Sequence, residues 1–352
     1  MNSLLKLTVE HQASDLHLIA GVPPHLRING RLIKLDMPSI VPDELRGLLY
    51  SILNTEQIKT LEENLELDFS HSIWGVSRFR GNILYQRSTL GAVLRVVPFE
   101  IPSFESLGLP KKIKDLCSLN RGLVLVTGPT GSGKSTTLAA MIDHINTHRN
   151  LNILTIEDPI EFLHSHRNSI VSQREIGSDT HSFSRALRHA LRHDPDVILI
   201  GEMRDLDSIS IALTAAETGH LVLSTLHTQN APLTVNRIVD AFNDEKRAYI
   251  RQQLSNSLQA IISQQLIPKI DGNGRIAAVE LMLNTPAVGN MIRDEKEHQL
   301  YSVIQTNHGQ GMQSMDQALV KLYSLGKISM DNAFDYCIDR KEMERMILSY
   351  NQ

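Results

Sequence analysis

Short apolar runs alternate with amphipathic stretches through the middle of the chain. From Leu123 onward, four apolar, β-branched segments end in polar residues: "LVLVTG", "LNILTIED", "DVILIGE" and "HLVLSTLHT". Stretches with helical spacing, such as "KSTTLAAMIDHI" and "SFSRALRHALRH", lie between them. This alternation predicts a parallel sheet covered by helices, with functional residues at the carboxyl ends of the strands.

The first hundred residues follow the pattern of a small mixed domain. Apolar residues between Leu4 and Leu16 predict an opening amphipathic helix, and "HLRINGRLIKL" predicts a hairpin that turns at Asn29-Gly30. The segment "SRFRGNILYQRSTLGAVLRVVP" alternates apolar and polar residues, as half-buried strands do. We therefore predict a domain over residues 1–97, a proline-containing linker over 98–110 and a second domain over 111–352 that is mostly helical after about residue 245.

Composition narrows the class of protein without defining it. The chain has 352 residues, 41% of them hydrophobic, and a net charge of −4, so no nucleic-acid partner is expected. Cys117 and Cys337 are far apart and neither belongs to a CxxC pair, which argues against a disulfide scaffold or a cysteine-ligated zinc site. The sequence shows neither a signal peptide nor the roughly 18-residue apolar run of a membrane span, so we expect a cytoplasmic protein.

The stretch "GPTGSGKSTTLAAMI" carries the strongest chemical signal. Gly128, Gly133, Lys134 and Ser135 fit G-x-x-x-x-G-K-[ST] between a predicted strand and a predicted helix. Backbone N–H groups of such a loop and the helix N-terminus together hold an anion. Lys134 can reach the β- and γ-phosphates and Ser135 can ligate Mg²⁺, so ATP and Mg²⁺ are the expected cofactors. The expected binding residues are Gly128, Thr130, Gly131, Ser132, Gly133, Lys134, Ser135 and Thr136.

Acidic residues follow two of the predicted strands. In "DVILIGEMRD", Gly201 occupies the place usual for an aspartate, so Glu202 is expected to orient Mg²⁺ through water, with Asp205 close by. One carboxylate is also needed to position or deprotonate the attacking water. The stretch "TIEDPIEF" offers three candidates, which the residue chemistry alone does not rank: Glu157, Asp158 and Glu161.

Two histidines and three arginines complete the candidates. His220 and His227 stand at either end of one predicted strand, roughly 23 Å apart, so they cannot share a metal ion unless the chain bends, and a role in sensing or coupling is favoured. Arg80, Arg87 and Arg95 lie in the first domain. They are surface strand residues unless another subunit presents them to ATP.

These four motifs, in this order, resemble the secretion ATPase superfamily, the hexameric motors of type II secretion and type IV pili. The P-loop, "TIEDPIEF" (the Asp box), "DPDVILIGEMRD" (the Walker B motif) and "LTAAETGHLVLSTLHT" (the His box) carry the resemblance. It extends over nearly the whole chain, from "ASDLHL", similar to the start of a PAS-like domain, to "GMQSMDQAL" in the C-terminal helical region. Within the superfamily the chain is most similar to the PilT-like pilus retraction ATPases.

The resemblance implies a RecA-like P-loop ATPase domain of α/β class, preceded by a small PAS-like α+β domain. It implies that Glu161 is the general base, that Glu202 is the Walker B carboxylate, and that His220 and His227 sense nucleotide and couple subunits. Some of the three arginines would reach ATP held between domains. The implied partners are five further copies in a homohexamer and an inner-membrane pilus platform protein, which places the chain at the cytoplasmic face of that membrane and in twitching motility.

One position departs from the PilT-like pattern and keeps alternatives open. Gly289 in "TPAVGNMIRD" stands where that family has an arginine in a segment linked to retraction. An ATPase of a related type II or type IV secretion system, or of another pilus system, is therefore the main alternative. A ring that binds ATP without hydrolysing it is opposed by the presence of Glu161 and Glu202, and a nucleic-acid translocase by the acidic balance.

Overall fold

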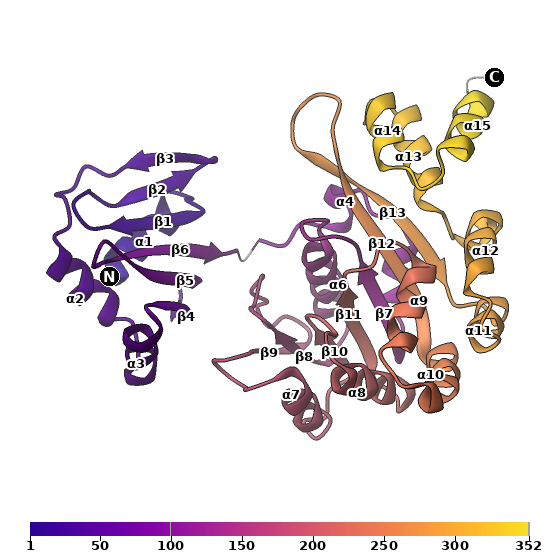
Figure 1. The fold of residues 1–352 in the computed structure, drawn as a ribbon, viewed down its shortest axis with the longest axis horizontal. Coiled ribbons are helices and arrows are strands. Elements are labelled where there is room, and N and C mark those ends of the chain that lie inside the picture. The colour runs from indigo at the N-terminus through magenta and orange to yellow at the C-terminus, as the bar shows by residue number, and fades with distance from the viewer. Residues whose placement is uncertain (99, 351–352) are drawn as a thin grey trace. The chain divides into compact units, whose positions relative to one another are not determined.

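The computed structural model describes residues 1–98 and 100–350 and divides into two compact units (Figure 1). The first unit comprises Met1–Glu100 with the short segment Glu161–Leu163. The second comprises Ile101–Ile160 and His164–Gln352. In the part of the chain that is described, no helix is both long enough and apolar enough to cross a bilayer.

The first unit is an antiparallel sheet of six strands with three helices. The strand order is β3-β2-β1-β6-β5-β4. The strands are β1 (Asp15–Ile19), β2 (His25–Ile28), β3 (Arg31–Lys34), β4 (Glu66–Ile73), β5 (Ser77–Gln86) and β6 (Thr89–Val97). The helices are α1 (Asn2–Glu10), α2 (Pro42–Tyr50) and α3 (Thr55–Asn64). One core built from both helices and strands, including Leu5, Leu45 and Phe79, holds this unit together.

Two local predictions for this unit have different outcomes. The hairpin is confirmed, because β2 and β3 pair around Asn29 and Gly30, both at positive φ. The extent of the opening helix is wrong: α1 ends at Glu10, Gln12 adopts φ 51°, and Leu16 is a buried residue of β1. Leu16 therefore belongs to the apolar side of a strand, although its spacing also fits a helix.

The second unit is built on a seven-stranded sheet in the order β13-β12-β7-β11-β10-β8-β9. Every neighbouring pair is parallel except β12 and β13. The strands are β7 (Gly122–Thr127), β8 (Asn152–Glu157), β9 (Ile170–Glu175), β10 (Val197–Ile200), β11 (Leu221–Leu226), β12 (Leu258–Pro268) and β13 (Arg275–Leu283). This is the predicted α/β class, with helices on both faces of a mostly parallel sheet.

Alternate residues of β7, an interior strand, face two different cores. Val124 and Val126 of β7 pack with the helices α4 (Phe104–Leu107), α5 (Lys112–Leu116) and α6 (Lys134–His148). Leu123 and Leu125 face the opposite layer. Four helices contribute most of that layer: α7 (Phe183–Ala190), α8 (Leu206–Glu217), α9 (Ala231–Asp240) and α10 (Asp244–Ser257). Because successive side chains of a strand point to opposite sides, β7 contributes apolar residues to the cores on both faces of the sheet.

The expectation of a mostly helical chain after about residue 245 is wrong in part. Residues 258–283 form β12 and β13, and β12 is an interior strand that lies between β7 and the edge strand β13. The β-branched run in "LQAIISQQLIP" is buried from Ala260 to Gln264, which a central strand explains. Helices take over after Leu283: α11 (Pro286–Arg293), α12 (Leu300–Thr306), α13 (Met315–Ser324), α14 (Met330–Tyr336) and α15 (Arg340–Tyr350).

Candidate nucleotide site

Four neighbouring parallel strands bring the sequence motifs to one edge of the sheet. Thr127 at the end of β7 pairs with Leu226 of β11, while Ile200 of β10 lies opposite Ile156 of β8. The P-loop, His227, Glu202 and the Asp box therefore follow one another along the carboxyl edge. Ligands of open α/β sheets bind at this edge, so the strand order itself assembles the candidate site.

The P-loop turns through three glycines with positive φ. Gly128, Gly131 and Gly133 have φ of 141°, 78° and 90°, and α6 begins immediately after them at Lys134. A Cβ on Gly128 would collide with the backbone oxygen of Gln264 and lie 2.6 Å from the Ser132 hydroxyl. Glycine is therefore required at Gly128 by close backbone packing as well as by φ.

The lysine of the P-loop is held inside the loop. Lys134 is buried, and its Nζ donates to the carbonyl oxygens of Gly128 at 2.8 Å and Pro129 at 3.0 Å. The Ser132 hydroxyl is also buried and has no hydrogen-bond partner within the described residues. Ser135 and Thr136 stand in the first turn of α6, where backbone N–H groups have no partner inside the helix. The loop thus presents donors suited to phosphate oxygens.

Two polar side chains of β12 support this loop from the side. The hydroxyl of Thr127 donates to Ser263 Oγ at 3.0 Å, and Thr137 Oγ1 donates to Gln264 Oε1 at 2.9 Å. Ser263 and Gln264 are buried. Neither residue was predicted from the sequence, although the three consecutive polar residues inside "IISQQL" were a signal that could have found them.

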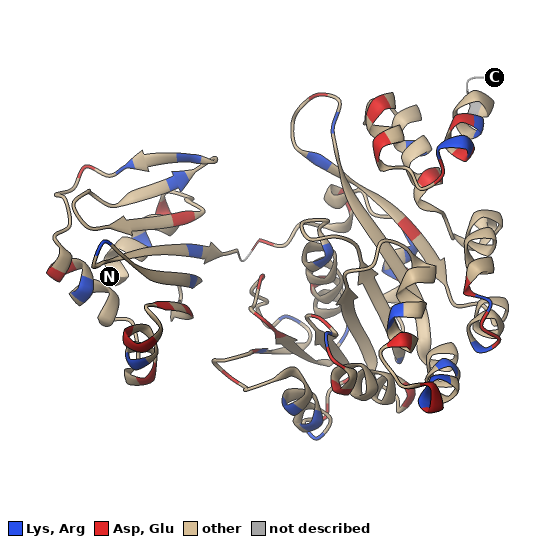
Figure 2. Ribbon diagram, in the orientation of Figure 1, with Lys and Arg blue, Asp and Glu red and all other residues tan. Residues whose placement is uncertain are grey.

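A chain of charged groups crosses the ends of β8, β10 and β11. Arg204 Nε donates to Glu202 Oε2 at 2.8 Å, and Arg204 Nη1 lies 3.6 Å from Asp158. His227 Nε2 lies 3.3 Å from the other oxygen of Glu202. The hydrogen bond to Glu202 raises the pKa of Arg204. Figure 2 shows acidic and basic residues next to one another in the segment leading into α8. Arg204, which links Glu202 to Asp158 of the Asp box, was not predicted from the sequence.

Gly201, at the position where the motif usually has an aspartate, packs closely against β8. The Gly201 amide donates to the Ile156 carbonyl at 2.8 Å, and a Cβ on Gly201 would lie 3.3 Å from the Cα of Glu157. An aspartate at this position would press against β8, whereas Glu202 projects beyond it. Asp205 has a separate role as the N-cap of α8, accepting from the Ser208 amide at 2.7 Å.

The three acids of the Asp box lie in different surroundings. Glu157 accepts hydrogen bonds from Thr155 Oγ1 at 2.7 Å and from Gln173 Nε2 at 3.2 Å. Asp158 belongs to the charged chain described above. Glu161 is exposed, and Glu161–Leu163 belong to the first unit, where the Leu163 amide donates to the Pro98 carbonyl.

The two histidines of the His box lie at opposite edges of the sheet. His227 follows β11 at the carboxyl edge beside Glu202. His220 precedes β11, and its Nδ1 lies 3.0 Å from the Ala215 carbonyl. The structure therefore brings His227 into the candidate site and leaves His220 at the other end of the strand.

The three candidate arginines occupy the sheet of the first unit. Arg80 of β5 lies opposite Arg95 of β6, and Arg95 Nε donates to the buried Asp15 at 2.8 Å. Arg87 is exposed in the two-residue turn between β5 and β6, at φ 48°. Asp15 thus engages Arg95, while Arg87 stands in a turn where its side chain is accessible.

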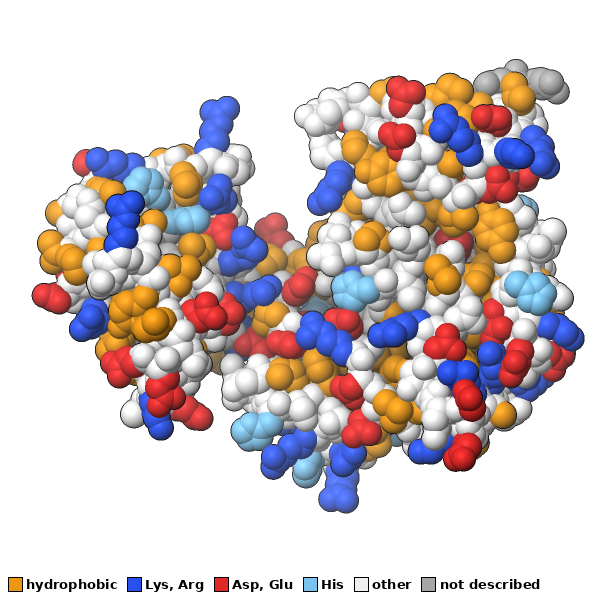
Figure 3. Space-filling view, viewed as in Figure 1, with side chains coloured by type: hydrophobic (Ala, Val, Ile, Leu, Met, Phe, Trp, Pro, Cys, Tyr) orange, Lys and Arg blue, Asp and Glu red, His pale blue; other side chains and the backbone are white. Residues whose placement is uncertain are grey.

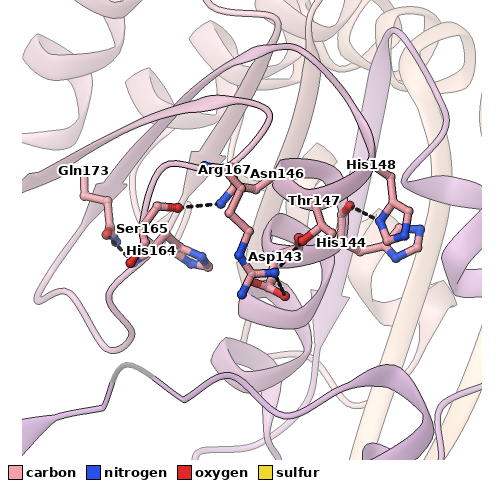
Figure 4. A network of polar contacts seen from close by, with 9 residues as sticks. All are labelled: Asp143, His144, Asn146, Thr147, His148, His164, Ser165, Arg167 and Gln173. Carbon is pink, nitrogen blue, oxygen red and sulfur yellow. Dashed lines mark hydrogen bonds and ion pairs between the residues drawn. The ribbon is translucent and has the colours of Figure 1, made fainter.

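His164, shown in Figure 4, adds a pH-dependent contribution to stability. Burial lowers the pKa of this histidine to about 4, and the charge of Arg167 acts in the same direction. As the pH falls below about 6.5, the unfolded chain takes up a proton that the folded chain does not. The stability that neutral His164 contributes is therefore lost on acidification from about pH 6.5 toward pH 4. The loss in the free energy of unfolding approaches roughly 3 kcal/mol at the acid end of this range.

Replacing His164 by glutamine is expected to flatten the fall in the free energy of unfolding between about pH 6.5 and 4.5. Urea titrations of the purified chain at several pH values measure this, with His189→Gln, an exposed change on α7, as the control. An acid slope in His164→Gln equal to that of the wild type would show that the histidine does not carry the effect.

A mostly parallel sheet with a P-loop after one strand and an acidic residue after another strand, at the same carboxyl edge, defines a P-loop nucleotide hydrolase. The chain belongs to the type II/IV secretion system protein family, whose family model matches residues 10–280. It is an α/β ATPase of this family.

Three relatives are similar to the chain over nearly its whole length. It is 51% identical to the type IV pilus retractation ATPase PilT of Pseudomonas aeruginosa, covering 95% of this chain and 96% of that protein. It is 47% identical to a twitching motility protein of Neisseria gonorrhoeae, covering 94% and 88%. Its structure matches a crystal structure of the pilus retraction motor PilT with bound ADP, with a TM-score of 0.89, 50% identity and coverage of 97% and 98%.

Proposed function

We propose that the chain is the ATPase motor of type IV pilus retraction and so drives twitching motility. The observation that carries this proposal is the 51% identity to PilT over 95% of the chain, together with the intact P-loop edge. Gly128–Thr136 bind the phosphates of ATP in this proposal. The buried Ser132 hydroxyl and the first turn of α6 fit a phosphate group because they are hydrogen-bond donors around one concave loop.

Mg²⁺ is the second proposed cofactor. Ser135 and, through water, Glu202 would hold it, since both supply oxygen atoms, the ligands that Mg²⁺ prefers. Bound there, the ion would neutralise charge on the phosphates during transfer. Within residues 1–98 and 100–350, no group of three or more histidine, cysteine, aspartate or glutamate residues is arranged to hold a metal ion.

Glu161 is the proposed general base and Glu202 the proposed Walker B carboxylate. Arg204 and His227 engage both oxygens of Glu202, which fixes its orientation and connects it to the His box. His227 is thus the proposed nucleotide sensor. His220, at the other edge of the sheet, is proposed to couple subunits rather than to contact the nucleotide.

The working form is proposed to be a homohexamer. Arg80, Arg87 and Arg95 lie in a unit that has no P-loop of its own, so a neighbouring copy can supply them to ATP. An arginine presented in this way stabilises charge in the transition state and can raise the rate about 10³- to 10⁵-fold. Turnover that is highest in the monomer fraction of a size-resolved ATPase assay would contradict this arrangement.

We propose that the energy of ATP hydrolysis drives movement between the two units. This movement would act on an inner-membrane pilus platform protein, with the ATPase at the cytoplasmic face of that membrane. A count of surface pili in cells that lack the protein tests this. We expect excess pili and loss of surface motility, corrected by the wild type and not by Lys134→Ala. A normal pilus count in the deletion strain would contradict pilus retraction and favour another secretion or pilus system.

Gly289 is the reason why an ATPase of another secretion or pilus system remains the alternative. It is buried in α11, where an added Cβ would lie 3.4 Å from the Ser255 carbonyl oxygen. This is an ordinary van der Waals distance, so a Cβ fits at Gly289 without a clash, whereas the PilT-like pattern has an arginine at this position. On the face shown in Figure 3, acidic and basic side chains of the second unit are interspersed, which gives no support to a nucleic-acid translocase.

A further inference from the structure

We infer that Glu280 is a positioning residue for ATP hydrolysis, because its buried carboxyl group holds the helix that begins four residues after His227. The inference rests on the proposed function, in which His227 helps to orient Glu202. Glu280 belongs to β13, His227 follows β11, and Ala231 begins α9. All of these residues belong to the second unit.

The carboxyl group of Glu280 lies at the N-terminus of α9. Its Oε1 accepts a hydrogen bond from the Ala231 amide at 2.8 Å, and the residue is fully buried. The amide of a first helical residue has no partner inside its own helix, so Glu280 supplies the partner that Ala231 would otherwise lack. The helix dipole also favours a carboxylate at this end of a helix. Glu280 therefore holds the start of α9 against β13.

Burying an acidic residue in the middle of β13 carries a free-energy cost. Burial raises the pKa of Glu280 to about 7, although the amides of Ala231 and Met315 and the Ser263 hydroxyl lower it. Ser263 is the residue opposite Glu280 in the antiparallel pair of β12 and β13. An apolar side chain at this position would avoid the cost of burial. The contact with α9, rather than packing, is therefore what requires an acidic residue here.

The start of α9 is also tied to the residue beside His227. Thr228 Oγ1 lies 2.6 Å from Thr234 Oγ1 of α9, and Thr234 Oγ1 donates to the Asn230 carbonyl at 2.7 Å. His227, which directly precedes Thr228, lies 3.3 Å from Glu202. A shift of α9 would therefore move Thr228 and His227 with it. A misplacement of about 1 Å at a catalytic site can cost 10²-fold in rate.

The other helix beside Glu280 is held independently. Met315, whose amide also acts on the Glu280 carboxyl group, is the first residue of α13. The segment before it pairs with β13 through the backbone, because Leu281 and Gln313 exchange hydrogen bonds at 2.8 and 3.2 Å. Ser314 caps α13 in a capping box. Loss of the Glu280 carboxyl group should therefore displace α9 rather than α13.

The test compares kcat and nucleotide affinity in the purified full-length chain. Glu280→Met keeps a long buried side chain and removes the acceptor for the Ala231 amide. We expect kcat to fall about tenfold or more, with the affinity for a fluorescent ADP analogue unchanged, because the P-loop keeps its contacts with β12. Amides at the start of α9 should exchange with deuterium faster than in the wild type. Glu280→Gln keeps an acceptor in the same place, so its kcat should stay within about threefold of wild type.

Asp316→Ala is the matched control for a loss of stability alone. Asp316 is another fully buried acid, and it accepts hydrogen bonds from Tyr301 and from the amides of Ile338 and Asp339, none of which belongs to α9. Its replacement should lower the free energy of unfolding in urea and leave kcat near the wild-type value. A loss of kcat in Asp316→Ala equal to that in Glu280→Met would overturn the inference, because destabilisation alone would then account for the effect.

A double variant separates positioning of His227 from other routes. Glu280→Met added to His227→Ala should lower kcat no further than His227→Ala alone, because both act through the same side chain. Wild-type kcat in Glu280→Met, an equal loss in Glu280→Gln, or losses that multiply in the double variant would overturn the inference. If His227→Ala alone keeps wild-type kcat, the role of His227 in the proposed function fails, and the inference with it. Should Glu280→Met not fold, Thr228→Val breaks the link between α9 and the residue beside His227, and the same criteria apply to it with Thr228→Ser as its conservative variant.

Discussion

Replacing Glu161 by glutamine is expected to lower kcat for ATP hydrolysis by about 10²- to 10⁴-fold while ATP remains bound. Glutamine has nearly the same shape as glutamate but cannot accept a proton from the attacking water. The binding groups of the P-loop lie elsewhere in the chain, so the change should leave nucleotide affinity intact. Steady-state ATPase rates together with titration of a fluorescent ADP analogue measure the two effects separately.

The matched control is Glu157→Gln, in the same motif. Glu157 accepts hydrogen bonds from Thr155 and Gln173, and its replacement should act mainly on this local structure. A larger loss of kcat in Glu157→Gln than in Glu161→Gln would transfer the base assignment to Glu157, one of the three acids that residue chemistry alone does not rank.

Gly128→Ala is expected to abolish nucleotide binding at ordinary concentrations. The new Cβ would meet the Gln264 backbone oxygen and the Ser132 side chain, and alanine is strained at φ 141°. Strain and overpacking together cost roughly 2–6 kcal/mol. Most of this cost falls on the loop conformation that binds phosphate, so an affinity loss of about 100-fold or more follows. Titration with a fluorescent ADP analogue measures it.

Gly131→Ala is the matched control in the same loop. Gly131 also has positive φ, at 78°, but a Cβ there would meet no atom within 4 Å. It therefore reports the cost of φ alone. If Gly131→Ala and Gly128→Ala lose the same affinity, contact with β12 is not what makes Gly128 necessary.

The parts of the fold that could be predicted from the sequence are those with local signals. The apolar runs that became β7, β8, β10 and β11 end in polar residues and are separated by helical periodicity. β12 also carries an apolar run, but it follows α10 directly: Ser257 ends the helix and Leu258 begins the strand at ψ 135°. Because no glycine or proline marks this junction, no local signal in the sequence shows where the helix ends and the strand begins.

The parts of the site that could not be predicted depend on contacts between distant segments. Glu202 follows a strand in an obvious way, whereas Arg204 acquires its place only because the ends of β8 and β10 are neighbours. Gln264 supports the P-loop across 127 residues from Thr137. The local sequence pattern contains no signal for contacts between residues so far apart in the chain.

Live observation of labelled pili tests the central claim most directly, that ATP hydrolysis at this sheet edge drives pilus retraction. Retraction events are followed in cells whose only copy of the protein is wild type or Glu161→Gln, expressed at equal levels. We expect frequent retraction with the wild type and none with Glu161→Gln, although pili still extend. Retraction at wild-type speed in the Glu161→Gln cells, or in cells without the protein, would contradict it.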